Sequence, residues 1–149
     1  MRSRSTGTTR RGCSGSDRRS GQALRAAAGP DFIVHCGDDG LALAFFALGA
    51  AGLTSVFSNY DPEICVALHR AWAEGDTQRA LEIHEVLRPA AEAMFIENSP
   101  APVKYLLSEA GHIGPDARLP IAKPSSGARA ELDRMVQTYS AHRTGLALG

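Results

Sequence analysis

The chain has 149 residues and a mass of 15.8 kDa, with 44% hydrophobic residues and equal numbers of basic and acidic side chains. This composition is typical of a globular domain and argues against a disordered chain. No stretch of about 18 consecutive apolar residues occurs, which excludes a transmembrane helix. Three scattered cysteines without a CxxC pair argue against a disulfide framework and a zinc site, so we expect a reducing, cytoplasmic location.

The charges are unevenly distributed along the chain. Residues 1–25 contain seven arginines and one acidic residue, whereas the remainder contains nine basic and 15 acidic residues. Residues 1–22 have almost no apolar side chains, so we expect this leader to be disordered. Three interpretations stay open: a transit peptide, which lacks an apolar face here; a nucleic-acid-binding arm, disfavoured because no aromatic residue accompanies the arginines; and the start of a truncated gene, which we favour.

The ordered part is expected to begin near Ala23, with the last turns of a helix over 23–28. The apolar run 32–36 predicts a buried strand, and the apolar segment 41–48 predicts a helix. A second buried strand is predicted over 53–57. Because a helix connects the two strands, they should be parallel, with a right-handed crossover.

The rest of the chain is predicted to be helical. Pro62 suits a first helical position, and Gly75 ends that helix. Asp76 then caps a longer helix, which Pro89 should kink. Two more helices are expected over 103–110 and 128–140. The apolar stripe of the long helix comprises Ala80, Ile83, Leu87, Ala91, Met94 and Phe95.

These elements predict an α/β fold with three parts: the leader 1–22, a strand-containing segment 23–75 and a helical segment 76–149. Two parallel strands cannot form a free-standing sheet, because both are edges with unpaired backbone groups and two apolar faces. The strands therefore require a partner that the predicted elements do not supply.

Several short motifs occur in a fixed order from Asp31 onward. They are Gly37-Asp38-Asp39, Ala47-Leu48-Gly49-Ala50-Ala51-Gly52, Ser55-Val56 with Asn59, Leu87-Arg88-Pro89, Met94-Phe95-Ile96-Glu97, Pro102-Val103-Lys104 and Arg118-Leu119-Pro120. In this order the sequence resembles the dihydrodipicolinate synthase and N-acetylneuraminate lyase family of class I aldolases, and most of all its dihydrodipicolinate synthases.

The resemblance implies a TIM barrel followed by a C-terminal helical domain. A barrel needs eight strands and typically about 250 residues. The chain would supply the last two parallel strands, their helices and the helical domain. We therefore expect it to act as a homo-oligomer or to pair with a complementary or full-length barrel.

The resemblance also implies a reaction, the aldol condensation of pyruvate with aspartate semialdehyde in lysine biosynthesis. These enzymes hold pyruvate as a Schiff base on a lysine of the sixth strand and need no metal or other cofactor. The corresponding place in this chain falls on Arg11 or Gly12. Arginine cannot replace lysine, because its guanidinium stays protonated. The family's Gly-Gly-Thr-Thr-Gly-Glu loop and its proton-relay tyrosine are also missing, so we expect no catalysis by this chain alone.

Two residues match family positions beside bound pyruvate. Thr54 corresponds to a residue whose backbone carbonyl faces the substrate, although an ordinary strand residue is the simpler interpretation. Gly37 corresponds to a glycine beside the same pocket, although we favour a turn that needs a flexible backbone as the explanation. No catalytic residue and no metal ligand is assigned.

Other reactive side chains are given structural interpretations. Asp38 and Asp39 open a helix after a strand, where acidic residues favour the helix dipole. The five histidines show no ligand spacing, and His35 is expected to line the core or the barrel. Lys104 is the tempting substitute nucleophile, but the family has a second lysine at that place, and Lys123 is a weaker candidate. The remaining histidines are His69, His84, His112 and His142.

Overall fold

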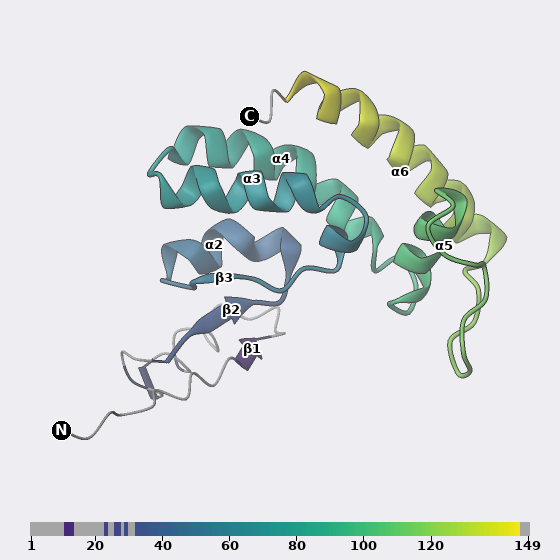
Figure 1. Ribbon diagram of the computed structural model, residues 1–149, viewed down its shortest axis with the longest axis horizontal. Coiled ribbons are helices and arrows are strands. Elements are labelled where there is room, and N and C mark those ends of the chain that lie inside the picture. Colours follow the sequence, from purple (N-terminus) through teal and green to yellow (C-terminus); the bar gives the residue numbers. More distant parts are fainter. Residues whose placement is uncertain (1–10, 14–22, 24–25, 28, 30–31, 147–149) are drawn as a thin grey trace.

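The computed structural model describes residues 11–13, 23, 26–27, 29 and 32–146. In Figure 1 the short strands lie at one end, with helices stacked beside them and extending away. The elements are β1 (Arg11–Cys13), β2 (Val34–Cys36), η1 (Asp39–Leu41), α2 (Ala42–Ala47), β3 (Gly52–Leu53), η2 (Phe57–Asn59), α3 (Pro62–Ala73), α4 (Thr77–Ala93), α5 (Ala101–Glu109) and α6 (Ser126–Gly145). Residues 23, 26 and 27 are helical, and the rest of the helix expected over 23–28 lies outside the described residues.

The strands form one parallel sheet in the order β1-β2-β3. His35 pairs with Gly12 on one side and with Gly52 on the other. The parallel pairing of β2 and β3 across α2 confirms that the two predicted strands are parallel, and the right-handed crossover stays a prediction. The strand β1 corrects the expectation that residues 1–22 lack structure; the other residues of that leader lie outside the described part of the chain. Its three residues carry no apolar pattern, and strand pairing uses backbone groups, so composition gave no signal.

The second predicted strand is shorter than expected. The prediction placed it over 53–57, but β3 contains only Gly52 and Leu53. Thr54 still donates a backbone hydrogen bond to the Cys36 carbonyl at 2.7 Å. The chain then leaves the sheet and forms η2, a short helix that begins at Phe57.

Local sequence signals explain where the helices begin. The Asp61 carboxylate caps α3 by accepting from the Ile64 amide, and Pro62 follows it. Asp76 caps α4 in the same way, and Gly75, at φ +82°, turns the chain between the two helices. Pro89 lies inside α4 without ending it, so the kink expected there stays a prediction. α5 begins two residues before its predicted range and ends one residue before the predicted end, whereas α6 extends beyond its predicted range at both ends.

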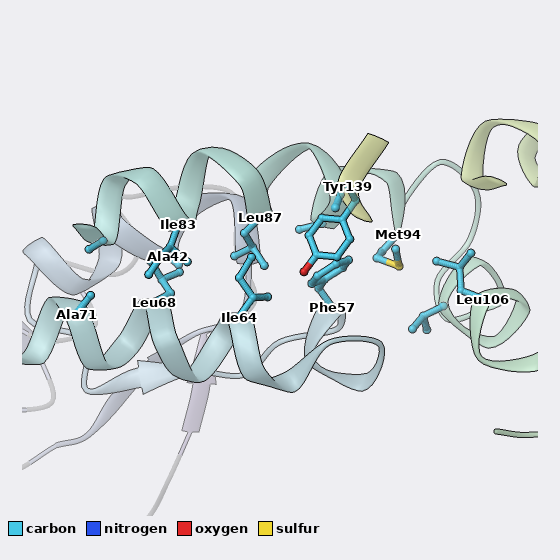
Figure 2. Close-up of a cluster of buried hydrophobic side chains, with 14 of the residues drawn as sticks. Ala42, Phe57, Ile64, Leu68, Ala71, Ile83, Leu87, Met94, Leu106 and Tyr139 are labelled. Atoms are coloured by element: carbon cyan, nitrogen blue, oxygen red, sulfur yellow. The ribbon is translucent and has the colours of Figure 1, made fainter. Parts of the chain in front are cut away.

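The helices enclose one continuous core. Figure 2 shows Ile64 and Leu68 of α3 facing Ile83 and Leu87 of α4, with Tyr139 of α6 beside Phe57. This core crosses residue 75, so the division into segments 23–75 and 76–149 stays a prediction. The predicted α4 stripe is buried except for Phe95, which is 51% exposed because it follows the last turn of the helix. Among the described helices, none is both long and apolar enough to cross a bilayer.

Candidate functional site

The candidate site lies at the carboxyl ends of β2 and β3, which meet at one edge because the strands are parallel. Gly37 directly follows β2, and Thr54 directly follows β3. In α/β barrels this edge carries the active site. The structure thus places the two residues proposed to contact substrate at the same edge of the sheet.

The backbone carbonyl of Thr54 is available to a ligand. In the described part of the chain, no donor forms a hydrogen bond to this carbonyl oxygen, although the Thr54 amide is bonded to Cys36. The residue itself is exposed. A backbone carbonyl without a partner at the edge of a sheet can accept a hydrogen bond from a small molecule.

Gly37 is half-buried at the end of β2. Its backbone does not have a positive φ, a conformation that Gly29, Gly49, Gly75 and Gly111 adopt among the described residues. Gly37 therefore does not adopt a left-handed conformation, and both interpretations of this glycine, a substrate contact and a turn that needs a flexible backbone, stay predictions.

Asp38 and Asp39 perform different tasks. Asp38 caps η1, accepting from the Gly40 amide at 3.0 Å, which confirms the helix-capping interpretation for this residue. Asp39 is only 1% exposed. Its Oδ2 accepts from the amides of Val56 and Phe57, at 3.1 and 3.2 Å. Asp39 thus caps η2 rather than its own helix, which the sequence did not predict because the partners are 17 and 18 residues away.

One oxygen of the Asp39 carboxylate has no hydrogen-bond partner among the described residues. This Oδ1 is buried, and so is the unpartnered Nε2 of His84 on α4. Burial lowers the pKa of His84, while hydrogen bonding to the backbone of Gly40 and Asp39 opposes that shift. His84 therefore contacts the backbone of η1 from α4, which packs against that short helix.

The histidines form no metal site. In the part of the chain that the structure describes, no three metal-ligating side chains converge. His69 is bonded to the Ala51 carbonyl and His142 to the Thr138 carbonyl. His35 packs over Gly52, where a Cβ would lie 3.2 Å from the imidazole ring, so a side chain at this position would require the ring to shift slightly.

Neither lysine reaches the candidate site. Lys104 on α5 and Lys123 line a small cavity of about 120 Å³, which also includes Arg129 and does not include Gly37 or Thr54. Lys123 pairs with Asp116 at 3.4 Å.

The exposed edge of β3 borders a hollow of about 620 Å³, which we call the β3-edge hollow. Its lining includes His35, Leu53, Cys65, Val66 and His69. Burial raises the pKa of the Cys65 thiol to about 11, so this cysteine is not a reactive thiolate at neutral pH. Val66 is 54% exposed there, an apolar side chain beside an unpaired strand edge.

Comparisons with known proteins agree with this geometry. The model of the Dihydrodipicolinate synthetase family matches residues 12–139. The 4-hydroxy-tetrahydrodipicolinate synthases of Hyphomonas neptunium and Rickettsia felis are 44% and 38% identical, over 68% and 78% of this chain. The chain spans only 35% and 40% of those two relatives.

Solved structures show the same fold. The 4-hydroxy-tetrahydrodipicolinate synthase from Methylacidiphilum fumariolicum SolV superposes with a TM-score of 0.85 at 31% identity, covering 90% of this chain and 45% of that one. Dihydrodipicolinate synthase from Aquifex aeolicus gives 0.83 at 34% identity, covering 88% and 45%. The fold is the C-terminal part of a TIM barrel with its helical extension, and the chain belongs to the dihydrodipicolinate synthetase family.

Proposed function

We propose that this chain supplies the pyruvate-facing wall of a 4-hydroxy-tetrahydrodipicolinate synthase-type aldolase. The reaction is the condensation of pyruvate with aspartate semialdehyde in lysine biosynthesis, in the cytoplasm. The observation that carries the proposal is the unpartnered carbonyl of Thr54, which lies at the same sheet edge as Gly37. A pyruvate-like small molecule is the ligand.

The Schiff-base lysine has to come from another polypeptide segment. β1 is the strand next to β2, and its residues are Arg11, Gly12 and Cys13. A guanidinium cannot form the imine that this chemistry needs. The chain alone is therefore catalytically inactive, and a segment bearing the lysine completes the site.

The β3-edge hollow supports the pairing with such a segment. Closure of an eight-stranded barrel requires another strand beside β3, and the apolar lining at Leu53 and Val66 provides a surface for it. The same surface supports the alternative proposal, a non-catalytic assembly fragment that pairs with a complementary or full-length barrel. Homo-oligomers are a further proposed consequence of this surface.

Pyruvate trapping separates these proposals. The chain is incubated with pyruvate and borohydride, and its intact mass is measured. We expect no adduct; an adduct on Lys104 or Lys123 would contradict the proposed inactivity. The chain is then mixed with the segment of the Hyphomonas neptunium relative that precedes the aligned region. The catalytic proposal expects an adduct on that segment only when the chain is present, whereas the assembly proposal expects a complex without an adduct.

A matched pair of substitutions tests the pyruvate wall. Gly37→Val places a branched side chain beside the proposed pocket and should abolish trapping in the mixed sample. Gly114→Ala is the control, because nothing lies within 4 Å of a Cβ at that position. If both variants support the same amount of pyruvate adduct, Gly37 does not line the pyruvate site.

A further inference from the structure

The segment that carries the Thr54 carbonyl is held at both ends. On the sheet side, the Thr54 amide is bonded to the Cys36 carbonyl at 2.7 Å. On the other side, the Val56 amide is bonded to Asp39 Oδ2 at 3.1 Å. The peptide group between Thr54 and Ser55 therefore lies between two anchored peptide groups, and its carbonyl direction is set by both.

The Asp39 anchor is itself rigid. The carboxylate is 1% exposed, and Asp38 caps the short helix on which it lies. α4 packs against this helix, with His84 beside it. A second amide, that of Phe57, is bonded to the same oxygen at 3.2 Å. Charge-assisted hydrogen bonds of this kind, in a buried place, are stronger than those between neutral groups.

The turn after Thr54 adds a local brace. Ser55 Oγ accepts from the Ser58 amide at 2.7 Å, and Ser58 Oγ donates to the Ser55 carbonyl at 3.1 Å. Such a turn fixes residues 55–58 relative to one another, but it does not fix them relative to the sheet. Among the described contacts of this segment, the bonds from Asp39 tie it to the end of β2.

We propose that Asp39 is a positioning residue, which aims the Thr54 carbonyl at bound pyruvate by holding the Val56 and Phe57 amides against the end of β2. This inference rests on the proposed function, because it assigns a role to Thr54 in that site. The unpartnered Oδ1 fits a residue retained for the position of its other oxygen. A hydrophobic side chain at position 39 could not accept the bonds from the Val56 and Phe57 amides. A carboxylate on a flexible loop could accept these bonds but would not fix the two amides in place.

The first test uses the chain alone and does not depend on catalysis. Hydrogen exchange of the Val56 and Phe57 amides is compared in the wild type, Asp39→Ala and Asp39→Asn. The alanine variant should lose about tenfold or more of the protection at these two amides, because each loses a charged acceptor. The asparagine oxygen still accepts, so Asp39→Asn should recover most of it. Unchanged protection in Asp39→Ala overturns the proposal.

The second test uses the chain mixed with the lysine-bearing segment of the Hyphomonas neptunium relative. Asp39→Ala should raise the KM for pyruvate about tenfold with little change in kcat, since a ground-state contact is misplaced. Asp39→Asn should restore most of the affinity, and Asp116→Ala, which removes a surface carboxylate paired with Lys123, is the control with an unchanged KM. A merely structural role would lower the apparent kcat at constant KM, and that result overturns the proposal. A wild-type mixture that forms no adduct contradicts the proposed function instead, and the exchange experiment then decides the role of Asp39 in holding the segment.

Discussion

Tyr139 connects the last helix to the start of α3. Its hydroxyl donates to Asp61 Oδ2 at 2.7 Å, and its ring packs edge-on against Phe57 with centroids 5.1 Å apart. Tyr139→Phe keeps the ring and removes the hydrogen bond, so unfolding should become easier by about 1 kcal/mol. Urea denaturation measures this change. Tyr105→Phe is the matched control: its hydroxyl donates to Asp133 at the surface, and equal losses in both variants would contradict the assigned role.

Asp61 should make stability depend on pH. Partial burial raises the pKa of this carboxyl, but hydrogen bonds from Tyr139, Arg143 and the Ile64 amide outweigh burial and hold the pKa below its ordinary value. Its stabilisation is therefore complete above the unfolded pKa of about 3.9 and is lost as the pH falls through the lower folded pKa. Urea midpoints measured from pH 6 downward should fall in this acid range.

Asp61→Asn isolates that contribution. Asparagine carries no charge and has a single acceptor oxygen, so it cannot accept both the Ile64 bond at Oδ1 and the Tyr139 and Arg143 bonds at Oδ2. This variant should therefore be less stable at pH 6 and should lose less stability on acidification than the wild type. Asp133→Asn, at an exposed carboxyl, is the control with a wild-type profile. Parallel profiles for Asp61→Asn and the wild type would show that other carboxyls dominate acid unfolding.

At the scale of elements, the turn between α3 and α4 depends on one glycine. Gly75 has φ +82°, and nothing lies within 4 Å of a Cβ built on it, so conformation alone decides the cost of a side chain. Gly75→Ala should destabilise the chain by about 1 kcal/mol. Gly127→Ala is the reverse control: this glycine lies in the first turn of α6 with room for a methyl group, so we expect a small gain in stability. Both changes in stability are measured by thermal unfolding. An unchanged stability of Gly75→Ala would contradict the claim that the positive φ at this position disfavours a side chain.

The helices were predictable because their signals are local. Pro62, Asp76 and Gly75 lie at or beside the ends they define, and a repeat of apolar residues marks each buried face. The strand ends were not predictable. The apolar run 53–57 does not continue as a strand, because the amides of Val56 and Phe57 donate to Asp39 and not to a neighbouring strand, and that contact joins residues far apart in the sequence. β1 has no apolar pattern, and only its pairing with β2 reveals it.

The candidate site was also predictable only in part. The order of the sequence motifs identified Gly37 and Thr54 as candidate residues, and the sheet brings both to one edge. The role of Asp39 could not be predicted from the sequence, because the interaction with the helix dipole is already a sufficient explanation for an acidic residue at a helix start. Its 1% exposure and its bonds to another segment are properties of the folded chain.

For the whole molecule, the unpaired edge of β3 should control association. Val66 is 54% exposed in the β3-edge hollow, where a strand from another polypeptide would cover it. Val66→Lys should weaken binding of the lysine-bearing segment by about tenfold, because the ammonium group would be buried at the new contact. Sedimentation velocity of titrated mixtures gives the affinity, and the chain alone gives its self-association.

Leu119→Lys is the control for this prediction. Leu119 is 93% exposed, more than Val66, but it lies in the loop between α5 and α6 and does not line the hollow. If general surface hydrophobicity drives association, the Leu119 variant should show the larger effect. If the β3 edge drives it, only the Val66 variant should lose affinity, and pyruvate trapping in the mixed sample should fall in proportion. Wild-type association by Val66→Lys would mean that the partner of this half-barrel does not dock beside β3.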